Sequence, residues 1–149
     1  MLEVDVVRIS VIVPIYNVKL YIERCVRSLM EQTLENIEFI FVNDCTPDDS
    51  MDILHYVLEE YPKRREQIKI IEHETNRGIS AVRNTGLKNA TGQYIIYCDS
   101  DDWVEKNMYE KLLVKALETS ADIVGCDFFD DYVAHSTIRK QLFPQQSEK

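Results

Sequence analysis

The sequence predicts an α/β fold in which a doubly wound, mostly parallel sheet has helices on both faces. Short β-branched apolar runs alternate with stretches of helical periodicity along nearly the whole chain. Each helical stretch has room for roughly 10 to 15 residues, the length of a crossover between parallel strands. The 149 residues, 45% of them hydrophobic, are enough for one domain with a sizeable core. Right-handed βαβ units are therefore expected.

Four apolar runs are the predicted strands of this sheet. They read ISVIVPIY from Ile9, IEFIFV from Ile37, IKIIEH from Ile68 and QYIIYC from Gln93. The first run is buried on both faces by this interpretation, because it is continuous rather than alternating. A fifth parallel strand is predicted in ADIVGCDFF, residues 121–129.

The segments between the strands have helical patterns. Apolar residues recur at helical spacing from Val18 to Leu29. PDDSMDILHYVLEEYP, residues 47–62, opens with acidic capping residues and stops before a proline. SAVRNTGLKNATG, residues 80–92, is a weaker helix, and a fourth helix is predicted over 105–119. The periodicity ends from Tyr132 onward.

Composition argues against several classes of protein. The chain has 26 acidic and 17 basic residues and a formal charge of -9, with no cluster of five basic residues, so we expect no nucleic-acid partner. No apolar stretch reaches the ~20 residues of a transmembrane span, and the acidic start does not resemble a signal peptide. The four cysteines form no CxxC pair, which favours buried or half-buried thiols in a reducing cytoplasm.

Polar and acidic groups follow each predicted strand. They occur in PIYN from Pro14, NDCTPDDS from Asn43, ETNRGIS from Glu74 and DSDDW from Asp99. Because the carboxyl ends of parallel strands form one edge of the sheet, where ligands bind, these groups are expected to converge. Neither GxGxxG nor GxxxxGK[ST] is present, so no glycine-rich phosphate cradle is predicted.

Each of these residues also has a plain structural interpretation. Asp48 and Asp49 are favoured as turn and helix-capping residues. Asp44, directly after a buried strand, is equally compatible with a turn and with contact to a base or ribose. Arg83 taken alone is interpreted as a surface residue, although its planar guanidinium also suits a phosphate or a base.

The carboxylates Asp99, Asp101 and Asp102 are harder to explain as a turn, because a turn needs only one such residue. Their mutual repulsion raises their pKa values unless a cation or donors compensate. In an extended segment, Asp99 and Asp101 point to the same side and can flank one hard cation. A divalent metal completed by substrate phosphates is therefore predicted, with Mn²⁺ or Mg²⁺ as the candidates, and a solvated turn is the alternative.

The ordered elements NRG, RNTG and DSDD within NRGISAVRNTGLKNATGQYIIYCDSDDW, together with VNDCTPDDS and ADIVGCDF, resemble the family 2 glycosyltransferases of the GT-A fold. The resemblance covers about residues 8–129. It implies that the nucleotide contacts seven positions: Pro14, Tyr16, Asn17, Asp44, Asn76, Arg83 and Asp99. It further implies that Asp101, with Asp99, binds the metal and that Asp102 is supportive. Cys45 stands where many relatives have glycine.

The reaction implied by the resemblance is inverting transfer of a sugar from a nucleoside diphosphate sugar, expected to be a uridine one, to an acceptor hydroxyl. The acceptor would be a saccharide or a lipid-linked chain in cell-surface polysaccharide synthesis. The protein would then work in the cytoplasm or at the inner face of the cell membrane. The alternatives are a nucleotide-sugar-binding module or fragment without activity, and a phosphoryl-transfer enzyme using Asp99, for which no partner motif is visible.

The expected organisation is one glycosyltransferase domain over 1–149, truncated relative to the family. About 8–129 would bind the nucleotide sugar, and 130–149 would start the acceptor region or form a disordered tail. The general base would then lie beyond Lys149, and its identity is unknown. An uncovered sheet edge and apolar surface would favour self-association.

Overall fold

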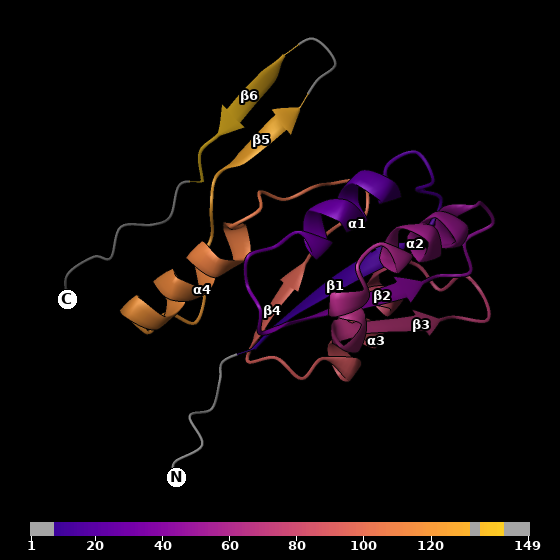
Figure 1. The fold of residues 1–149 in the computed structure, drawn as a ribbon, viewed down its shortest axis with the longest axis horizontal. Helices are drawn as coiled ribbons and strands as arrows, with labels where there is room; N and C mark the ends of the chain where they lie inside the picture. The colour runs from indigo at the N-terminus through magenta and orange to yellow at the C-terminus, as the bar shows by residue number, and fades with distance from the viewer. Residues whose placement is uncertain (1–7, 132–134, 142–149) are drawn as a thin grey trace. The chain divides into compact units, whose positions relative to one another are not determined.

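The computed structural model describes residues 8–131 and 135–141. The chain divides into two compact units, Met1–Met108 and Tyr109–Lys149. The first unit contains a four-stranded sheet whose strands are β1 (Ile9–Ile15), β2 (Ile37–Asn43), β3 (Ile68–Glu72) and β4 (Tyr94–Tyr97) (Figure 1). The strand order is β3-β2-β1-β4, and every pairing is parallel. The chain winds outward from β1 in both directions, which confirms the predicted doubly wound sheet.

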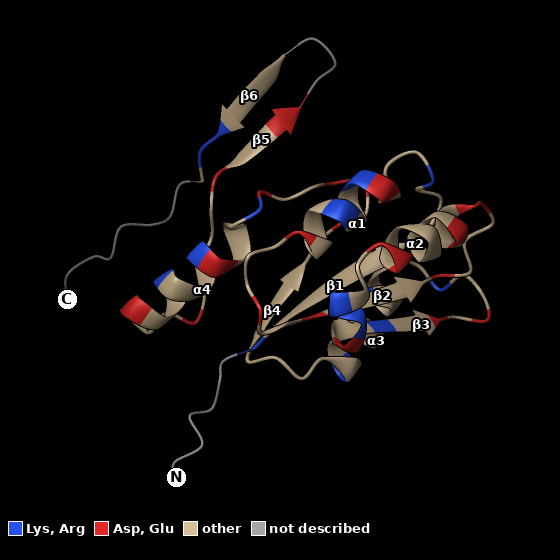
Figure 2. Cartoon of the chain, viewed as in Figure 1, with Lys and Arg blue, Asp and Glu red and all other residues tan. Residues whose placement is uncertain are grey.

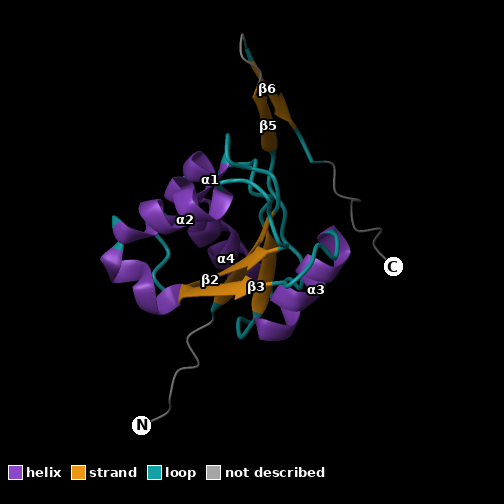
Figure 3. Ribbon diagram, turned by 90° about the vertical axis from the view of Figure 1, so that its right-hand side faces the viewer, coloured by secondary structure: helices purple, strands orange, loops and turns teal. Residues whose placement is uncertain are grey.

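Helices cover both faces of this sheet, as predicted. They are α1 (Ile22–Met30), α2 (Ser50–Glu59) and α3 (Ile79–Asn89), with a 3₁₀ turn, η1, over Pro62–Gln67. Viewed along the sheet, α1 and α2 lie on one side and α3 lies on the other (Figure 3). Each helix is the crossover or part of the crossover between parallel strands, which is why the apolar periodicity changes between the runs.

The core is built on the two central strands. All seven residues of β1 and all seven of β2 are buried, because both strands have a neighbour on each side and helices on both faces. Full burial of one such aliphatic side chain is worth about 1.5–3 kcal/mol. Helix α3 packs closely: a Cβ on Gly86 would lie 2.3 Å from Cγ2 of Ile12. Only glycine fits at that position without displacing the core.

The second unit differs from the prediction. It contains most of α4 (Met108–Thr119), followed by β5 (Phe128–Asp131) and β6 (Ser136–Arg139), which pair antiparallel as a hairpin. The expected fifth parallel strand over 121–129 is therefore wrong, and Ile123 within it is 85% exposed. Within the predicted tail 130–149, residues 132–134 and 142–149 lie outside the described residues. The division into domains stays a prediction.

Some helices carry charges of both signs. Helices α1 and α4 each carry acidic and basic segments (Figure 2), unlike the one-sided basic stripe of a nucleic-acid-binding face. Across residues 8–131 and 135–141, the structure contains no helix with the length and apolarity that a bilayer crossing requires. All four cysteines are free thiols. Cys25 and Cys98 are buried, but Cys45 and Cys126 are exposed, so the expectation of burial fails for the latter two.

Candidate functional site

The loops at the carboxyl edge of the sheet are tied together by hydrogen bonds between segments far apart in the sequence. The backbone N–H of Asn17, after β1, donates to Oγ1 of Thr46, after β2 (2.8 Å). The hydroxyl of Ser100, after β4, donates to the carbonyl of Pro14 at the end of β1 (2.6 Å). The predicted convergence of the strand ends is therefore present in the first unit.

Three predicted residues belong to the end of β1. Pro14 is buried in the strand, and Tyr16 is 44% exposed directly after it. Asn17 is exposed and has φ 56°, a left-handed backbone conformation that asparagine tolerates better than most residues. Tyr16 thus presents an aromatic side chain to solvent beside a sharply turning backbone.

Asp48 is structural, as favoured from the sequence. Its Oδ1 accepts from Oγ1 of Thr46 (2.7 Å), and from the backbone N–H (3.1 Å) and the hydroxyl (2.5 Å) of Ser50; its Oδ2 accepts from the backbone N–H of Lys19 (3.0 Å). Burial raises its pKa, but these hydrogen bonds dominate and lower it to about 2. Asp49 is the residue before α2 yet makes no side-chain cap bond. Asp48 rather than Asp49 therefore satisfies the start of α2.

Asp44 lies at the end of β2 with only 2% of its surface exposed. Its Oδ1 accepts from Nδ1 of His73 (2.7 Å) and from the backbone N–H of Arg77 (2.9 Å). Its Oδ2 accepts from the backbone N–H of Gly78 (2.7 Å). Burial raises the pKa of this carboxyl, but the three hydrogen bonds outweigh it and hold the pKa below the usual range. Asp44 is an ionised carboxylate that joins β2, β3 and the loop before α3.

The loop between β3 and α3 carries Asn76, which is exposed. Gly78 ends this loop with φ 83° and ψ 162°, a region that is essentially accessible to glycine alone. That conformation directs its N–H to Asp44 while its carbonyl accepts from Val82 in the first turn of α3. The glycine of the NRG element is thus required by its backbone conformation.

Arg83 is not a free surface cation. Its Nη2 donates to Oδ1 of Asp99 (2.9 Å), and its guanidinium lies over the ring of Tyr97, 5.6 Å from the centroid. The side chains of Arg83 and Asp99 remain 40% and 48% exposed. Nε of Arg83 is buried and has no hydrogen-bond partner among the described residues. The pair connects α3 to the end of β4 while leaving both groups accessible.

The segment from Asp99 to Asp102 is a turn, because the backbone N–H of Asp102 donates to the carbonyl of Asp99 (3.0 Å). The sequence argument assumed an extended segment with Asp99 and Asp101 on one side, and that premise is wrong. Asp101 and Asp102 are exposed. Partial burial and the charges of Asp101 and Asp99 raise the pKa of Asp102.

The three carboxylates supply the oxygen donors that a hard divalent cation prefers. Within the described residues, however, no three His, Cys, Asp or Glu side chains form a ready-made metal site. Asp99 is shared with Arg83. The residues present fit a cation that takes the rest of its ligands from water and substrate oxygens, which is usual for Mg²⁺.

Two residues of this edge were not identified from the sequence. His73 is 8% exposed and bonds Asp44 through one ring nitrogen and Oγ1 of Thr85 through the other (2.8 Å). Ser100 is 3% exposed and ties the aspartate turn to β1. The available signal for His73 was a titratable residue directly after the predicted third strand.

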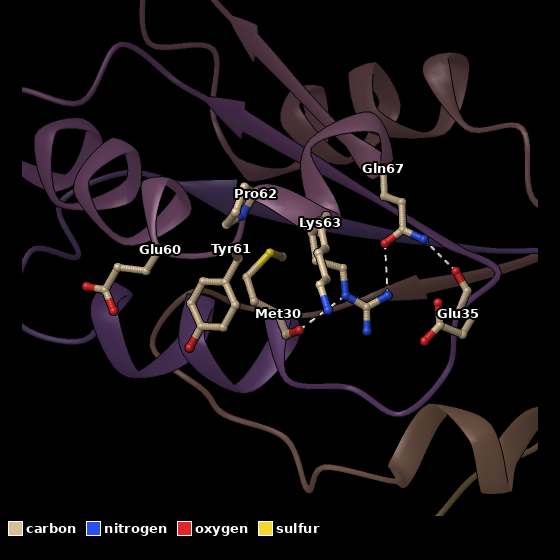
Figure 4. Close-up of a pocket in the computed structure, with 8 residues that line it drawn as sticks. Met30, Glu35, Glu60, Tyr61, Pro62, Lys63 and Gln67 are labelled. Carbon is tan, nitrogen blue, oxygen red and sulfur yellow. Dashed lines mark hydrogen bonds between the residues drawn. The ribbon is translucent and has the colours of Figure 1, made fainter.

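A pocket of about 440 Å³ lies elsewhere, among residues before β2 and before β3 and at the ends of α1 and α2 (Figure 4). Arg64 lines this pocket and donates to the backbone carbonyls of Met30 (3.2 Å), Leu34 (3.1 Å) and Gln32. It also donates to Oε1 of Gln67 (2.8 Å). These bonds satisfy carbonyls at the end of α1 and in the following turn, so Arg64 has a structural role.

A doubly wound sheet with charged and polar loops at its carboxyl edge is the arrangement of nucleotide-binding α/β proteins. Glycosyl transferase family 2 is the family whose model matches residues 10–148. The chain belongs to this family. The resemblance identified from the sequence is therefore confirmed, and so is the predicted fold class.

Two relatives illustrate the match. The chain is 45% identical over 140 residues to the uncharacterized glycosyltransferase EpsJ of Bacillus subtilis, covering 94% of this chain and 38% of that protein. It is 42% identical over 106 residues to the minor teichoic acid biosynthesis protein GgaB of the same organism, covering 70% and 11%.

Two solved structures share the fold. S. aureus TarS 1-349 in complex with UDP-GlcNAc has a TM-score of 0.68 and 32% identity, over 77% of this chain and 32% of that one. The mannosyltransferase PcManGT from Pyrobaculum calidifontis, in complex with GDP-Man and Mn²⁺, has a TM-score of 0.66 and 26% identity, over 78% and 33%. The matched part of the chain thus spans about a third of each of these two solved chains.

Proposed function

We propose that this chain forms the donor-binding part of an inverting glycosyltransferase. The reaction would transfer a sugar from a nucleoside diphosphate sugar, most simply a uridine one, to an acceptor hydroxyl. The proposal rests on the side chains at the carboxyl edge of the sheet, in a chain that belongs to family 2. There Asp44, buried and ionised, is hydrogen-bonded to the loop before α3, and Arg83 on α3 forms an accessible ion pair with Asp99 after β4.

The base of the donor is assigned to the first two strand ends. Pro14, Tyr16 and Asn17 would border the nucleotide, and Asp44 would contact the base. Tyr16 suits this role because its ring is exposed beside the buried carboxylate's strand end. The uridine assignment is supported by TarS, whose structure holds UDP-GlcNAc and which is 32% identical to this chain.

The ribose and diphosphate are assigned to the last two strand ends. Asn76 and Arg83 would face the nucleotide, and Asp99 would touch the ribose or support the metal. Arg83 keeps 40% of its side chain exposed and holds a buried Nε without a partner among the described residues, so it has donors to offer a phosphate.

Asp101 and Asp99 are the proposed ligands of Mn²⁺ or Mg²⁺, with Asp102 supportive. The cation, when bound, would offset the negative charge of the departing diphosphate. The Mn²⁺ in the PcManGT complex supports this assignment.

The acceptor is proposed to be a saccharide or lipid-linked chain used in cell-surface polysaccharide synthesis, which places the reaction in the cytoplasm or at the inner face of the membrane. The similarity to GgaB, a minor teichoic acid biosynthesis protein, supports an acceptor of this class. The alternative is a module that binds a nucleotide sugar without transferring it.

The test is calorimetric titration of UDP in the presence and absence of Mn²⁺, with Asp101→Ala and Asp102→Ala as matched variants. We expect Asp101→Ala to abolish the Mn²⁺-dependent part of binding and Asp102→Ala to weaken it less. A larger loss for Asp102→Ala would refute the metal assignment. Equal thermal protection by UDP and ADP at one concentration would remove the uridine assignment.

Transfer itself is tested by release of UDP from UDP-GlcNAc with and without a saccharide acceptor. Acceptor-dependent release supports the enzyme. Metal-dependent binding without acceptor-dependent release supports the binding module instead.

A further inference from the structure

His73 connects three elements of the first unit through its side chain and backbone. Its backbone N–H donates to the carbonyl of Asn43 at the end of β2 (2.9 Å). Its ring lies between the carboxylate of Asp44 and the hydroxyl of Thr85 on α3, at 2.7 and 2.8 Å. Only 5% of the His73 side chain and 3% of the Asp44 side chain are exposed. The imidazole is therefore held in one orientation.

The position of one ring proton follows from Asp44. This carboxylate is ionised at neutral pH, because its hydrogen bonds hold its pKa below the usual range, and an ionised carboxylate can only accept. Nδ1 of His73 must therefore carry the proton and donate to Oδ1. Nε2 is left to pair with the hydroxyl of Thr85.

The two carboxylate oxygens of Asp44 accept different numbers of hydrogen bonds. Each carboxylate oxygen has about two acceptor sites. Oδ1 receives His73 and the amide of Arg77, whereas Oδ2 receives only the amide of Gly78 among the described residues. One acceptor site on Oδ2 remains for a ligand N–H. Uracil presents an N–H at ring position N3, where cytosine presents an acceptor.

We propose that His73 is a positioning residue for selection of the nucleobase. By occupying Oδ1 through Nδ1–H, it orients the carboxylate so that Oδ2 is the oxygen that meets the base. This inference rests on the proposed function, in which the donor base binds beside Asp44. It assigns the preference for uracil over cytosine to His73, while the diphosphate is held by other loops.

Two substitutions separate the bonds made by the imidazole. The amide nitrogen of asparagine lies close to the position of Nδ1, so His73→Asn keeps the bond to Asp44 and loses the bond to Thr85. The amide nitrogen of glutamine lies close to the position of Nε2, so His73→Gln keeps the bond to Thr85 and loses the bond to Asp44. Thermal unfolding of each variant establishes that it is folded.

The experiment is the dissociation constant of UDP and of CDP, by calorimetry at one Mn²⁺ concentration, for the wild type and both variants. We expect the wild type to prefer UDP and His73→Asn to keep most of that preference, with the UDP:CDP ratio lowered about threefold because the bond from Thr85 that fixes the ring is lost. In His73→Gln the UDP:CDP ratio should fall about tenfold, which is the effect expected from losing a hydrogen bond to a charged group. The dissociation constant of CDP should change little.

The outcomes distinguish the inference from the function on which it rests. A wild type that binds neither nucleotide, or both equally, overturns the proposed uridine site and the role of His73 with it. If the wild type prefers UDP, two results overturn the role of His73 alone. Either both variants have the same UDP:CDP ratio, or both lose affinity for UDP and CDP in parallel. Parallel losses would mean a purely structural residue.

If His73→Gln does not fold, Thr85→Val and Thr85→Ser replace it, because Thr85 is only partly buried. Thr85→Val removes the bond that fixes the ring and should lower the UDP:CDP ratio about threefold, as expected for a neutral hydrogen bond. Thr85→Ser should restore the ratio. An unchanged ratio in Thr85→Val overturns the proposal.

Discussion

Replacing Glu38 with Gln is expected to destabilise the protein at neutral pH and to matter progressively less as the pH falls. Glu38 lies in β2 and is 2% exposed. Its Oε1 accepts from the hydroxyl of Ser10 (2.5 Å) and from the amide and hydroxyl of Thr91 (2.6 and 2.9 Å), and its Oε2 pairs with Nζ of Lys69 (2.9 Å). This carboxylate thus joins β1, β2, β3 and the turn before β4.

The size of the effect follows from the pKa of Glu38. Burial raises this pKa, but the hydrogen bonds from Ser10, Thr91 and Lys69 outweigh burial and lower it from 4.5 to about 2. At 1.36 kcal/mol per pH unit, ionisation of Glu38 stabilises the folded state by about 3 kcal/mol at pH 7. Because the folded pKa is the lower one, this contribution is complete above about pH 4.5 and is lost between about pH 4.5 and 2. At pH 3 roughly half of it remains.

The assay is urea unfolding of the wild type and Glu38→Gln at pH 7, 5, 4 and 3, followed by circular dichroism. The difference in unfolding free energy should shrink from about 3 to about 1.5 kcal/mol over that range. Glu66→Gln, at an exposed position of η1, is the matched control and should show a small, nearly constant difference. A pH-independent loss in Glu38→Gln would refute the reasoning, since it would mean that packing rather than charge stabilises this site.

Three further substitutions test the packing and backbone of the first unit by urea unfolding. Gly86→Ala should cost at least about 2 kcal/mol, because its Cβ would lie 2.3 Å from Cγ2 of Ile12; Asn84→Ala, exposed on the same helix, should change little. Arg64→Lys should cost about 2 kcal/mol, because an ammonium cannot reach the separate carbonyls that the guanidinium bonds, and a neutral result would contradict that role. Cys45→Gly should stabilise by about 0.5–1 kcal/mol, because Cys45 has φ 57°, and a loss of stability would show that its side chain contributes more than its strain costs.

Much of the first unit could be predicted because its signals are local. A continuous β-branched run such as the one from Ile9 can be satisfied only by burial on both faces, and that requirement alone predicts a central parallel strand. The run over 121–129 is also largely apolar, yet Ile123 within it is exposed. An apolar run indicates that burial is favourable, but it does not indicate which element of the fold buries it. The hairpin of β5 and β6 was missed because two four-residue strands are too short to show a period.

The sequence indicated which strand ends carry the candidate residues but not the hydrogen bonds between them, because those bonds join distant residues. Asp44 and His73 are 29 residues apart, and Asp44 and Gly78 are 34 apart, so no local pattern reveals that these donors converge on one carboxylate. The aspartates after β4 were expected to form an extended pair, whereas a single backbone bond from Asp102 to Asp99 makes the segment a turn.

The structure shows, for each aspartate in turn, which groups offset its negative charge. Asp44 is compensated by an imidazole and two amides, and Asp99 by the guanidinium of Arg83. At Asp102 burial and like charge prevail, and its pKa stays raised. Protein donors therefore offset the negative charge at Asp44 and Asp99 but not the repulsion at Asp102. That distinction required the structure, because all of these aspartates follow strands in the sequence and differ only in what the fold brings to them.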